Sequence, residues 1–419
     1  MAIAFMNGRL IDGNGGAPVD GATVLVEGKH IAAVGTRDSV RVPDDATVID
    51  VGGRTLMPGM MDLHVHLGGG AYRPVALLAK FLAAGFTTIG HVAGNQPTVT
   101  VPLRQAIEDG TLPWCARLLA GAVVTGTNGH VKGRTADGPW EVRKAVREMV
   151  EQKADFIKTA ATGGFASPDE ETWWVDYTYE ELAALTDEAH SVGVVVAVHA
   201  HSQPGLNNAI RAGCDQIHHG ALIDEEALHG IKEKGLFFIP TLRVTSQRNI
   251  DVKTAVGRPW ESRKMRETHD VHRKGVRLAH RLGITMGLGT DLPSSPPWDA
   301  GDSAIELKEL VACGLTPLEA ITVATKGSAQ CMRIEHKLGT LEAGKLADVV
   351  VVDGDPAEDV EVLLDVEHVR QVMKDGRVVV DRDRGFYGSV PAHRGAAQAA
   401  GRRGEAWVAC GTRVTMRRA

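Results

Sequence analysis

The stretch LMPGMMDLHVH, residues 56–66, is the most informative part of the chain. Its apolar run ends in two histidines, His64 and His66, separated by one residue. In an extended strand alternate side chains lie on the same face, so both imidazoles point the same way and suit one metal ion. Two alternating histidines also fit an ordinary polar strand face, and the pair by itself leaves that alternative open.

Further side chains of metal-binding type stand at the ends of other apolar runs. Lys158 ends DFIK, His199 ends VVVAVH and His219 ends DQIHH. Much later, Asp291 follows Gly-Thr at the end of another strand-like run. Chance rarely produces the order His-x-His, Lys, His, His, Asp with each member at a strand end, so the series favours a metal centre.

This ordered set resembles the ligand set of the amidohydrolase superfamily, in the group whose two metals are bridged by a carboxylated lysine. The resemblance runs from about residue 1 to about residue 385. The segments IKTAATGG (157–164), VHA (198–200) and IHHG (217–220) are similar to the branch of prolidase-like carboxypeptidases and imidazolonepropionase-like enzymes.

The alternation of short Val/Ile/Leu-rich runs with helix-like stretches from Thr87 onward is typical of βα units and a parallel sheet. Eight strands are predicted, the number that a (β/α)₈ TIM barrel needs. They end near His66, His91, Val124, Lys158, His199, His219, Thr241 and Asp291. Helices beginning near Tyr179 and Asp224 would pack outside this α/β barrel.

The two ends of the chain have a different pattern. Residues 22–34 and 372–380 are predicted as β-hairpins, the second turning on Asp-Gly, and residues 344–353 add a strand. We therefore expect one small discontinuous β-sandwich domain from residues 1–57 and 345–385, beside a barrel at 58–344. Residues 386–419, rich in Gly, Ala and Arg, are expected to form a tail.

Composition narrows the class of protein. The chain has 419 residues, 43% hydrophobic and 23% charged, as in ordinary globular proteins. Its net charge of −6 offers no basic surface for nucleic acid, and no apolar run reaches the length of a membrane span. The five scattered cysteines include no Cys-x-x-Cys and are odd in number, which argues against a disulfide framework. The N-terminus lacks the basic segment of a signal peptide. We expect a cytoplasmic homo-oligomer that acts on a small molecule.

The resemblance implies a role for each candidate ligand. His64, His66 and Asp291 would hold the buried metal, His199 and His219 the more exposed one, and Lys158 would bridge both as a carbamate formed with CO₂. Both metals are expected to be divalent, with zinc the predicted ion. A hydroxide between them would attack the carbonyl, and Asp291 would act as the base and then as the acid. Lys158 as an ordinary salt-bridging lysine is the alternative.

Two pairs of histidines close in the sequence each offer two candidates for one ligand position. We favour His199 over His201 as the ligand, because it ends the apolar run and matches the family. We favour His219 over His218, which we place behind the ligands.

Residues that contact substrate are predicted from their places in loops after the strands. His130 lies in a glycine-rich loop after the third strand, and Arg243 follows the seventh. In the loop after Lys158, Trp173, Trp174 and Tyr177 either line an apolar pocket or pack the loop. His201 stands where prolidase-like relatives often have a tyrosine, which weakens a plain dipeptidase interpretation.

Two enzymatic functions remain open. The first is hydrolysis of an amide-like C–N bond in a dipeptide or N-acyl amino acid, for which Arg243 is a candidate carboxylate clamp. The second is hydrolysis of a hydrophobic carbamate, urea or aryl amide, which the tryptophan pair would suit. A non-catalytic metal-stabilised binding protein is the remote third hypothesis.

Overall fold

Seven parallel strands form the central sheet of the computed structural model, which describes residues 2–70, 72–92, 97–293 and 297–387. The sheet order is β13-β12-β11-β10-β8-β7-β6, with the two-residue β9 (Arg134–Thr135) beside β8. The strands are β6 (Met60–Val65), β7 (Phe86–His91), β8 (Arg117–Thr125), β10 (Phe156–Ala160), β11 (Val195–Ala200), β12 (Gln216–His219) and β13 (Phe237–Ile239). The side chains of these strands are largely buried on both faces of the sheet, as expected where helices cover a parallel sheet.

The eighth position of the barrel is filled by residues 285–292, which are not a regular strand. On one side Phe238 donates its N–H to the carbonyl of Thr285 over 3.1 Å. On the other side Asp291 donates to the carbonyl of His64 over 2.7 Å, and His66 donates to that of Leu292 over 2.8 Å. The segment therefore closes the ring between β13 and β6, and the predicted (β/α)₈ barrel is confirmed.

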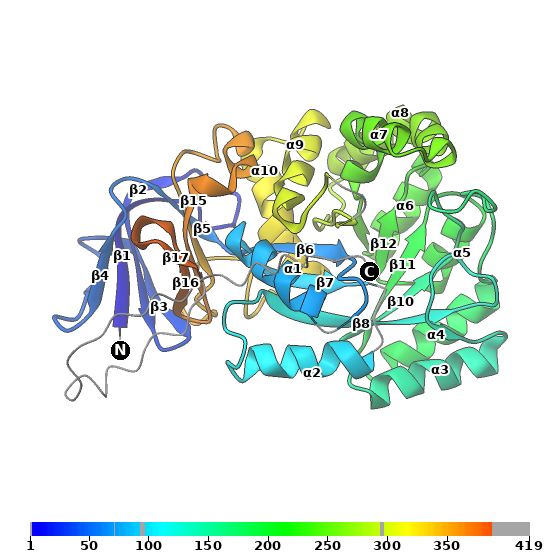
Figure 1. Ribbon diagram of the computed structural model, residues 1–419, viewed down its shortest axis with the longest axis horizontal. Coiled ribbons are helices and arrows are strands. Elements are labelled where there is room, and N and C mark those ends of the chain that lie inside the picture. The colour runs from blue at the N-terminus through cyan, green and yellow to red at the C-terminus, as the bar shows by residue number, and fades with distance from the viewer. Residues whose placement is uncertain (1, 71, 93–96, 294–296, 388–419) are drawn as a thin grey trace, which may run out of the picture. The chain divides into compact units, whose positions relative to one another are not determined.

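Helices follow the strands, as the alternating pattern predicted. Figure 1 shows α3, α4, α5 and α6 outside β10, β11 and β12. The helices are α1 (Tyr72–Ala83), α2 (Pro97–Glu108), α3 (Pro139–Glu151), α4 (Tyr179–His190), α5 (Gly205–Ala212), α6 (Glu225–Lys234), α7 (Gln247–Ala255), α8 (Pro259–Arg281), α9 (Ile305–Ala312), α10 (Pro317–Thr322) and α11 (Ser328–Cys331). A capping box between Thr178 and Glu181 begins α4, and Asp224 caps α6. Both predicted helices thus start where the sequence placed them.

Strands from both chain ends share a second, mostly antiparallel sheet. Its order is β17-β16-β15-β14-β5-β1-β2-β3, with β4 beside β1, and Figure 1 shows the first and last strands together. They are β1 (Ala2–Leu10), β2 (Val19–Glu27), β3 (His30–Thr36), β4 (Thr47–Asp50), β5 (Thr55–Pro58), β14 (Val349–Val352), β15 (Val369–Lys374), β16 (Arg377–Asp381) and β17 (Phe386–Tyr387). Both predicted hairpins are present, β2 with β3 and β15 with β16.

Two details differ from the sequence-based expectation. The strands of this region hydrogen-bond into one sheet, whereas a sandwich has two, and Phe5, Leu56 and Met373 belong to its apolar core. The predicted tail begins at residue 386, but residues 386–387 form β17 because they pair with β16. The rest of that tail lies outside the described residues.

One glycine connects the two sheets. Gly59 stands between β5 and β6, and a side chain there would meet Thr87 at 2.2 Å. The start of β6 is therefore packed tightly against β7, and the N–H of Gly59 donates to the carbonyl of Asp348 next to β14. In the described part of the chain, no helix has both the length and the apolar character needed to span a membrane.

Candidate metal centre and catalytic cavity

The six predicted metal ligands meet at one cavity of about 440 Å³. Each lies at the carboxyl end of a barrel strand or just beyond it, where barrel enzymes place their reactive groups. The cavity is lined by His64, His66, Lys158, His199, His219 and Asp291, among others. The structure thus brings together side chains from positions more than 200 residues apart.

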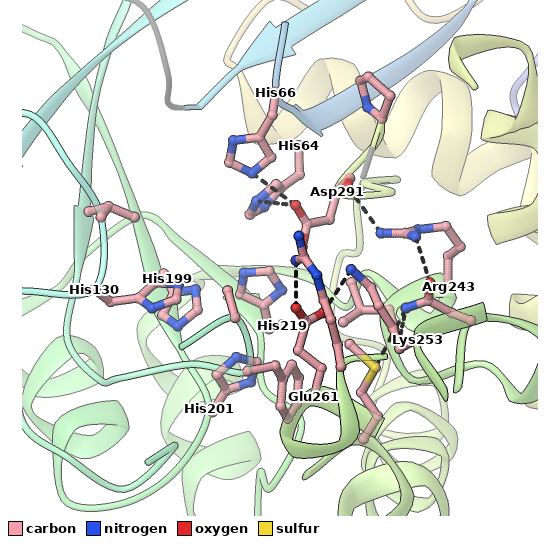
Figure 2. A pocket seen from close by; sticks show the side chains of 18 of the residues that line it. His64, His66, His130, His199, His201, His219, Arg243, Lys253, Glu261 and Asp291 are labelled. Carbon is pink, nitrogen blue, oxygen red and sulfur yellow. Dashed lines mark hydrogen bonds and ion pairs between the residues drawn. The ribbon is translucent and has the colours of Figure 1, made fainter. Parts of the chain in front are cut away.

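His64, His66 and Asp291 form the first cluster of potential ligands. Each offers an atom within 4.8 Å of the other two. The Nε2 atom of His66 lies 2.8 Å from Oδ1 of Asp291, and Nε2 of His64 lies 3.9 Å from the same oxygen (Figure 2). Two imidazoles and a carboxylate converging in this way suit a divalent ion such as Zn²⁺.

His199, His201 and His219 form the second cluster, again with ligand atoms within 4.8 Å of one another. The rings of His199 and His219 are 4.5 Å apart between centroids, and those of His201 and His219 are 4.9 Å apart. His201, predicted to contact substrate, therefore belongs to the same cluster as His199 and His219. Burial lowers the pKa of all three imidazoles well below its usual value, which keeps them in the neutral, metal-binding form.

Lys158 lies close to both clusters. Its charge contributes to lowering the pKa of His64 in the first cluster and of His199 and His219 in the second. The side chain is 1% exposed, and its Nζ atom has no hydrogen-bond partner among the described residues. Burial lowers the pKa of Lys158 to about 7. A neutral amine is therefore well populated at neutral pH.

A second layer of side chains orients the imidazoles. Nδ1 of His64 is 2.7 Å from Nδ1 of His218, whose Nε2 lies 3.0 Å from Oε1 of Gln216. Nδ1 of His219 is 2.7 Å from the hydroxyl of Thr241. In His64 and His219 these contacts engage Nδ1 and leave Nε2 for a ligand role. His218 accordingly lies behind His64.

Asp62 is a supporting residue that the sequence analysis missed. This fully buried carboxylate accepts hydrogen bonds from the hydroxyls of Thr290 and Ser303 and from the backbone N–H groups of His64 and Thr290. Burial raises its pKa to about 6 despite these donors. The available signal was an acidic residue inside an apolar strand, two positions before His64 and hence on the same face.

Arg243 supports the backbone of the eighth segment. Its buried guanidinium donates from Nε to the carbonyl of Thr290 over 2.6 Å and from Nη2 to that of Asp291 over 3.0 Å. Glu306, also missed, accepts the backbone N–H groups of Leu242 and Arg243. Burial raises the pKa of Glu306 to about 8. Arg243, predicted to contact substrate, lines the cavity, and it also holds the backbone of Asp291 in place.

The predicted substrate residues divide into two groups. His130 and His201 line the cavity, and the His130 ring stacks on that of His199 at 4.1 Å between centroids. Among the described residues, those lining the cavity do not include Trp173, Trp174 or Tyr177.

The aromatic residues of that loop have other environments. Trp173 is 61% exposed, and the buried hydroxyl of Tyr177 donates to the carbonyl of Ala136. The loop backbone is fixed by a bridge between Thr162 and Val175, which leaves the indoles toward solvent.

Several cavity residues come from outside the barrel strands and were not foreseen. Lys253 in α7, together with Arg258 and Glu261 at the start of α8, lines the wall near Asp291. Figure 2 shows Lys253 and Glu261 across the cavity from His130 and His199. Phe165 and Met265 supply apolar surface. No local sequence pattern predicts these residues, because the packing of α7 and α8 brings them to the cavity.

Comparison with known proteins agrees with this geometry. Residues 55–379 match the model of the amidohydrolase family. The chain is 30% identical to ochratoxinase from Aspergillus niger, with 88% of this chain and 85% of that protein covered. It is 26% identical to imidazolonepropionase from Symbiobacterium thermophilum, covering 88% and 92%. A solved Xaa-Pro dipeptidase with bound methionine superposes with a TM-score of 0.82 at 30% identity, covering 90% of this chain and 99% of that one.

The substitution Asp62→Ala tests the supporting layer. It leaves four buried donors without their acceptor, and each unsatisfied buried group costs roughly 1–3 kcal/mol. We expect the free energy of unfolding to fall by at least about 3 kcal/mol and metal content to drop, measured by denaturant unfolding and elemental analysis. Asp20→Ala, which removes an exposed partner of Arg9, is the control and should change stability little. A variant as stable and metal-rich as the wild type would show that Asp62 is dispensable.

Proposed function

The chain belongs to the amidohydrolase family of C–N bond hydrolases, and we propose that it uses two divalent metal ions, zinc in the native enzyme, to hydrolyse a dipeptide or N-acyl amino acid. His64, His66 and Asp291 would hold one ion and His199 and His219 the other. Lys158 would bridge them as a carbamate. His130 and His201 would contact the substrate.

The observation that carries this proposal is the buried amine of Lys158, which has no hydrogen-bond partner among the described residues and lies close to both clusters of potential ligands. An amine in this position favours reaction with CO₂. Its nitrogen lone pair forms the N–C bond and one proton leaves, which gives a carbamate with two oxygens. Such an anion would supply oxygen ligands for the metal ions and would remove the unsatisfied buried donor. The donor set therefore fits a pair of divalent ions.

When bound, the metals would supply Lewis-acid polarisation of the scissile carbonyl and activation of water. Asp291 supplies the proton transfer. Burial raises the pKa of Asp291. The hydrogen bond from His66 and the charges of His66, Arg243 and Lys253 lower it by more, so the pKa of Asp291 is lowered overall. The carboxylate is thus ready to accept a proton from the attacking water and to return it to the departing nitrogen. Arg243 keeps that carboxylate in place by holding the Asp291 backbone.

The charge of the cavity supports a substrate that carries a carboxylate. Apart from the proposed ligands, the charged residues that line it in the described part of the chain are Lys132, Arg243, Lys253, Arg258 and one acid, Glu261. This excess of cations favours an anionic small molecule. The similarity to a Xaa-Pro dipeptidase points in the same direction.

The second candidate is hydrolysis of a hydrophobic carbamate, urea or aryl amide. Its main support in the sequence was the tryptophan pair, which the structure does not bring to the cavity. Phe165, Val244 and Met265 still give the cavity an apolar side that suits such a group. The hypothesis of a non-catalytic binding protein is not supported, because the chain belongs to a family of hydrolases.

A substrate panel separates the two candidates. Purified metal-loaded protein is assayed with N-acyl amino acids and dipeptides against aryl carbamates, phenylureas and anilides. We expect the highest kcat/KM among the substrates with a free carboxylate, because the cationic wall interacts with that group. Higher kcat/KM for the neutral aryl compounds would select the second candidate.

Lys158→Ala tests the bridging role. The variant lacks the amine that captures CO₂, so we expect loss of most metal from the second cluster and of nearly all activity. Elemental analysis gives the metal content, and a crystal structure of the wild type should show density for a planar carbamate on Nζ. Lys144→Ala, which changes a lysine on the outer helix α3, should keep both metals. A fully metallated wild type with an unmodified Lys158 and normal turnover would refute the bridge.

Asp291→Asn tests the proton transfer. The amide has no carboxylate to accept a proton, so kcat should fall by at least about 10²-fold, the usual lower scale for a lost general base. Steady-state kinetics is combined with metal analysis, because Asp291 is also a proposed ligand. Near-normal kcat with both metals retained would exclude Asp291 from the mechanism.

A further inference from the structure

One wall of the cavity is built from ion-paired side chains that lie outside the barrel strands. We call Lys253, Arg258 and Glu261 the charged triad. Lys253 belongs to α7, Arg258 immediately precedes α8, and Glu261 lies in the first turn of α8. All three line the cavity that contains Asp291.

Glu261 holds the two cations of the triad in fixed positions. The carboxylate is buried, with 2% of the residue exposed. Its Oε2 atom lies 2.7 Å from Nζ of Lys253, and its Oε1 atom lies 2.7 Å from Nη1 of Arg258. Each carboxylate oxygen therefore positions one cation, and both cations are kept on the same wall.

The triad carries two positive charges and one negative charge, so its net charge is +1. Buried ion pairs contribute little to stability compared with apolar side chains of similar volume, because desolvation offsets their attraction. Stability alone gives no reason to place such a group on the wall of a catalytic cavity. The charge of Lys253 also acts on Asp291, so Arg258 is the cation of the triad that remains for an anion in the cavity.

Arg258 has donors available for that anion. Among the described residues it pairs through Nη1 alone, with Glu261. Its side chain is 46% exposed and borders the cavity. A guanidinium has five N–H donors in a planar fork that matches a carboxylate. Arg243, the alternative clamp, instead directs Nε and Nη2 to the carbonyls of Thr290 and Asp291.

We propose that the charged triad is the subsite that binds the free carboxylate of the substrate, with Arg258 as the contacting residue and Glu261 as the residue that positions it. This inference rests on the proposed function and adds to it. The enzyme selects amides that carry a carboxylate, and the selection resides in α7 and in the residues at the start of α8.

The test compares Arg258→Gln with the wild type on two substrates, an N-acyl amino acid and its C-terminal carboxamide. Both contain the same scissile amide, and only the first has the negative charge. Loss of a charge-assisted contact should lower kcat/KM for the acid about 10- to 100-fold, mainly through a higher KM. The loss for the acid should exceed that for the carboxamide at least tenfold. Arg258→Lys, which keeps the charge, should recover part of the discrimination.

Arg263→Gln is the matched control. Arg263 lies on the same helix, its side chain is 48% exposed, and it pairs with Glu171 and Glu267. It is not one of the described residues that line the cavity. Its replacement should leave kcat/KM for both substrates unchanged. Equal losses for acid and carboxamide in Arg258→Gln would overturn the subsite and assign the triad to helix packing.

An inhibition experiment on the unmodified enzyme gives an answer even if the variant does not fold. The free amino acid product should inhibit competitively at a concentration at least tenfold lower than its carboxamide. Equal inhibition would contradict the proposal. If the wild type cleaves acid and carboxamide equally well, the subsite fails and the amide hydrolase function stands. If it cleaves neither, while aryl carbamates are cleaved, the proposed substrate class fails as well.

Discussion

The amine of Lys158 is the group around which the catalytic end of the barrel is organised. A buried donor without a partner is unfavourable in any protein, and here it lies beside imidazoles whose pKa values are lowered by burial. The carboxylate of Asp291 is the acid whose charge acts on Lys158, and it opposes the effect of burial on the pKa of that amine. In the proposed function, metal ions and a lysine carbamate would add ligands and charges of both signs to these groups.

Holding such an arrangement requires backbone strain at its edges. Three non-glycine residues at the site have left-handed backbones, His219 at φ 72°, Thr241 at φ 52° and Asp291 at φ 61°. Each such residue costs on the order of 1–3 kcal/mol. The hydrogen bonds of Asp62 to Thr290 and of Arg243 to the Thr290 and Asp291 carbonyls oppose this cost. The irregular eighth segment is thus kept in place by side chains where regular strand pairing is absent.

The sequence predicted the parts of this site that depend on local order. A ligand at a strand end is visible because its strand is an apolar run, and parallel strands put their carboxyl ends together. His64 and Lys158 could be found in this way, together with the barrel that aligns them. Asp62 was overlooked although it obeys the same alternation, because a lone acid in a strand has no assigned role until its partners are known. Trp173 was placed after the correct strand, but the direction of an indole in a loop depends on backbone bridges that no sequence pattern encodes.

The charged triad was beyond the reach of sequence analysis for a different reason. Lys253 and Glu261 are eight positions apart, and only the packing of α7 against α8 makes them an ion pair on a cavity wall. The proposed separation of substrate binding from metal binding follows from this placement. Main-chain pairing of the barrel strands fixes most of the proposed metal ligands, whereas the triad lies on α7 and at the start of α8, outside that pairing. In the proposed subsite these side chains would determine which amide is bound, and the groups proposed to cleave it would stay on the barrel.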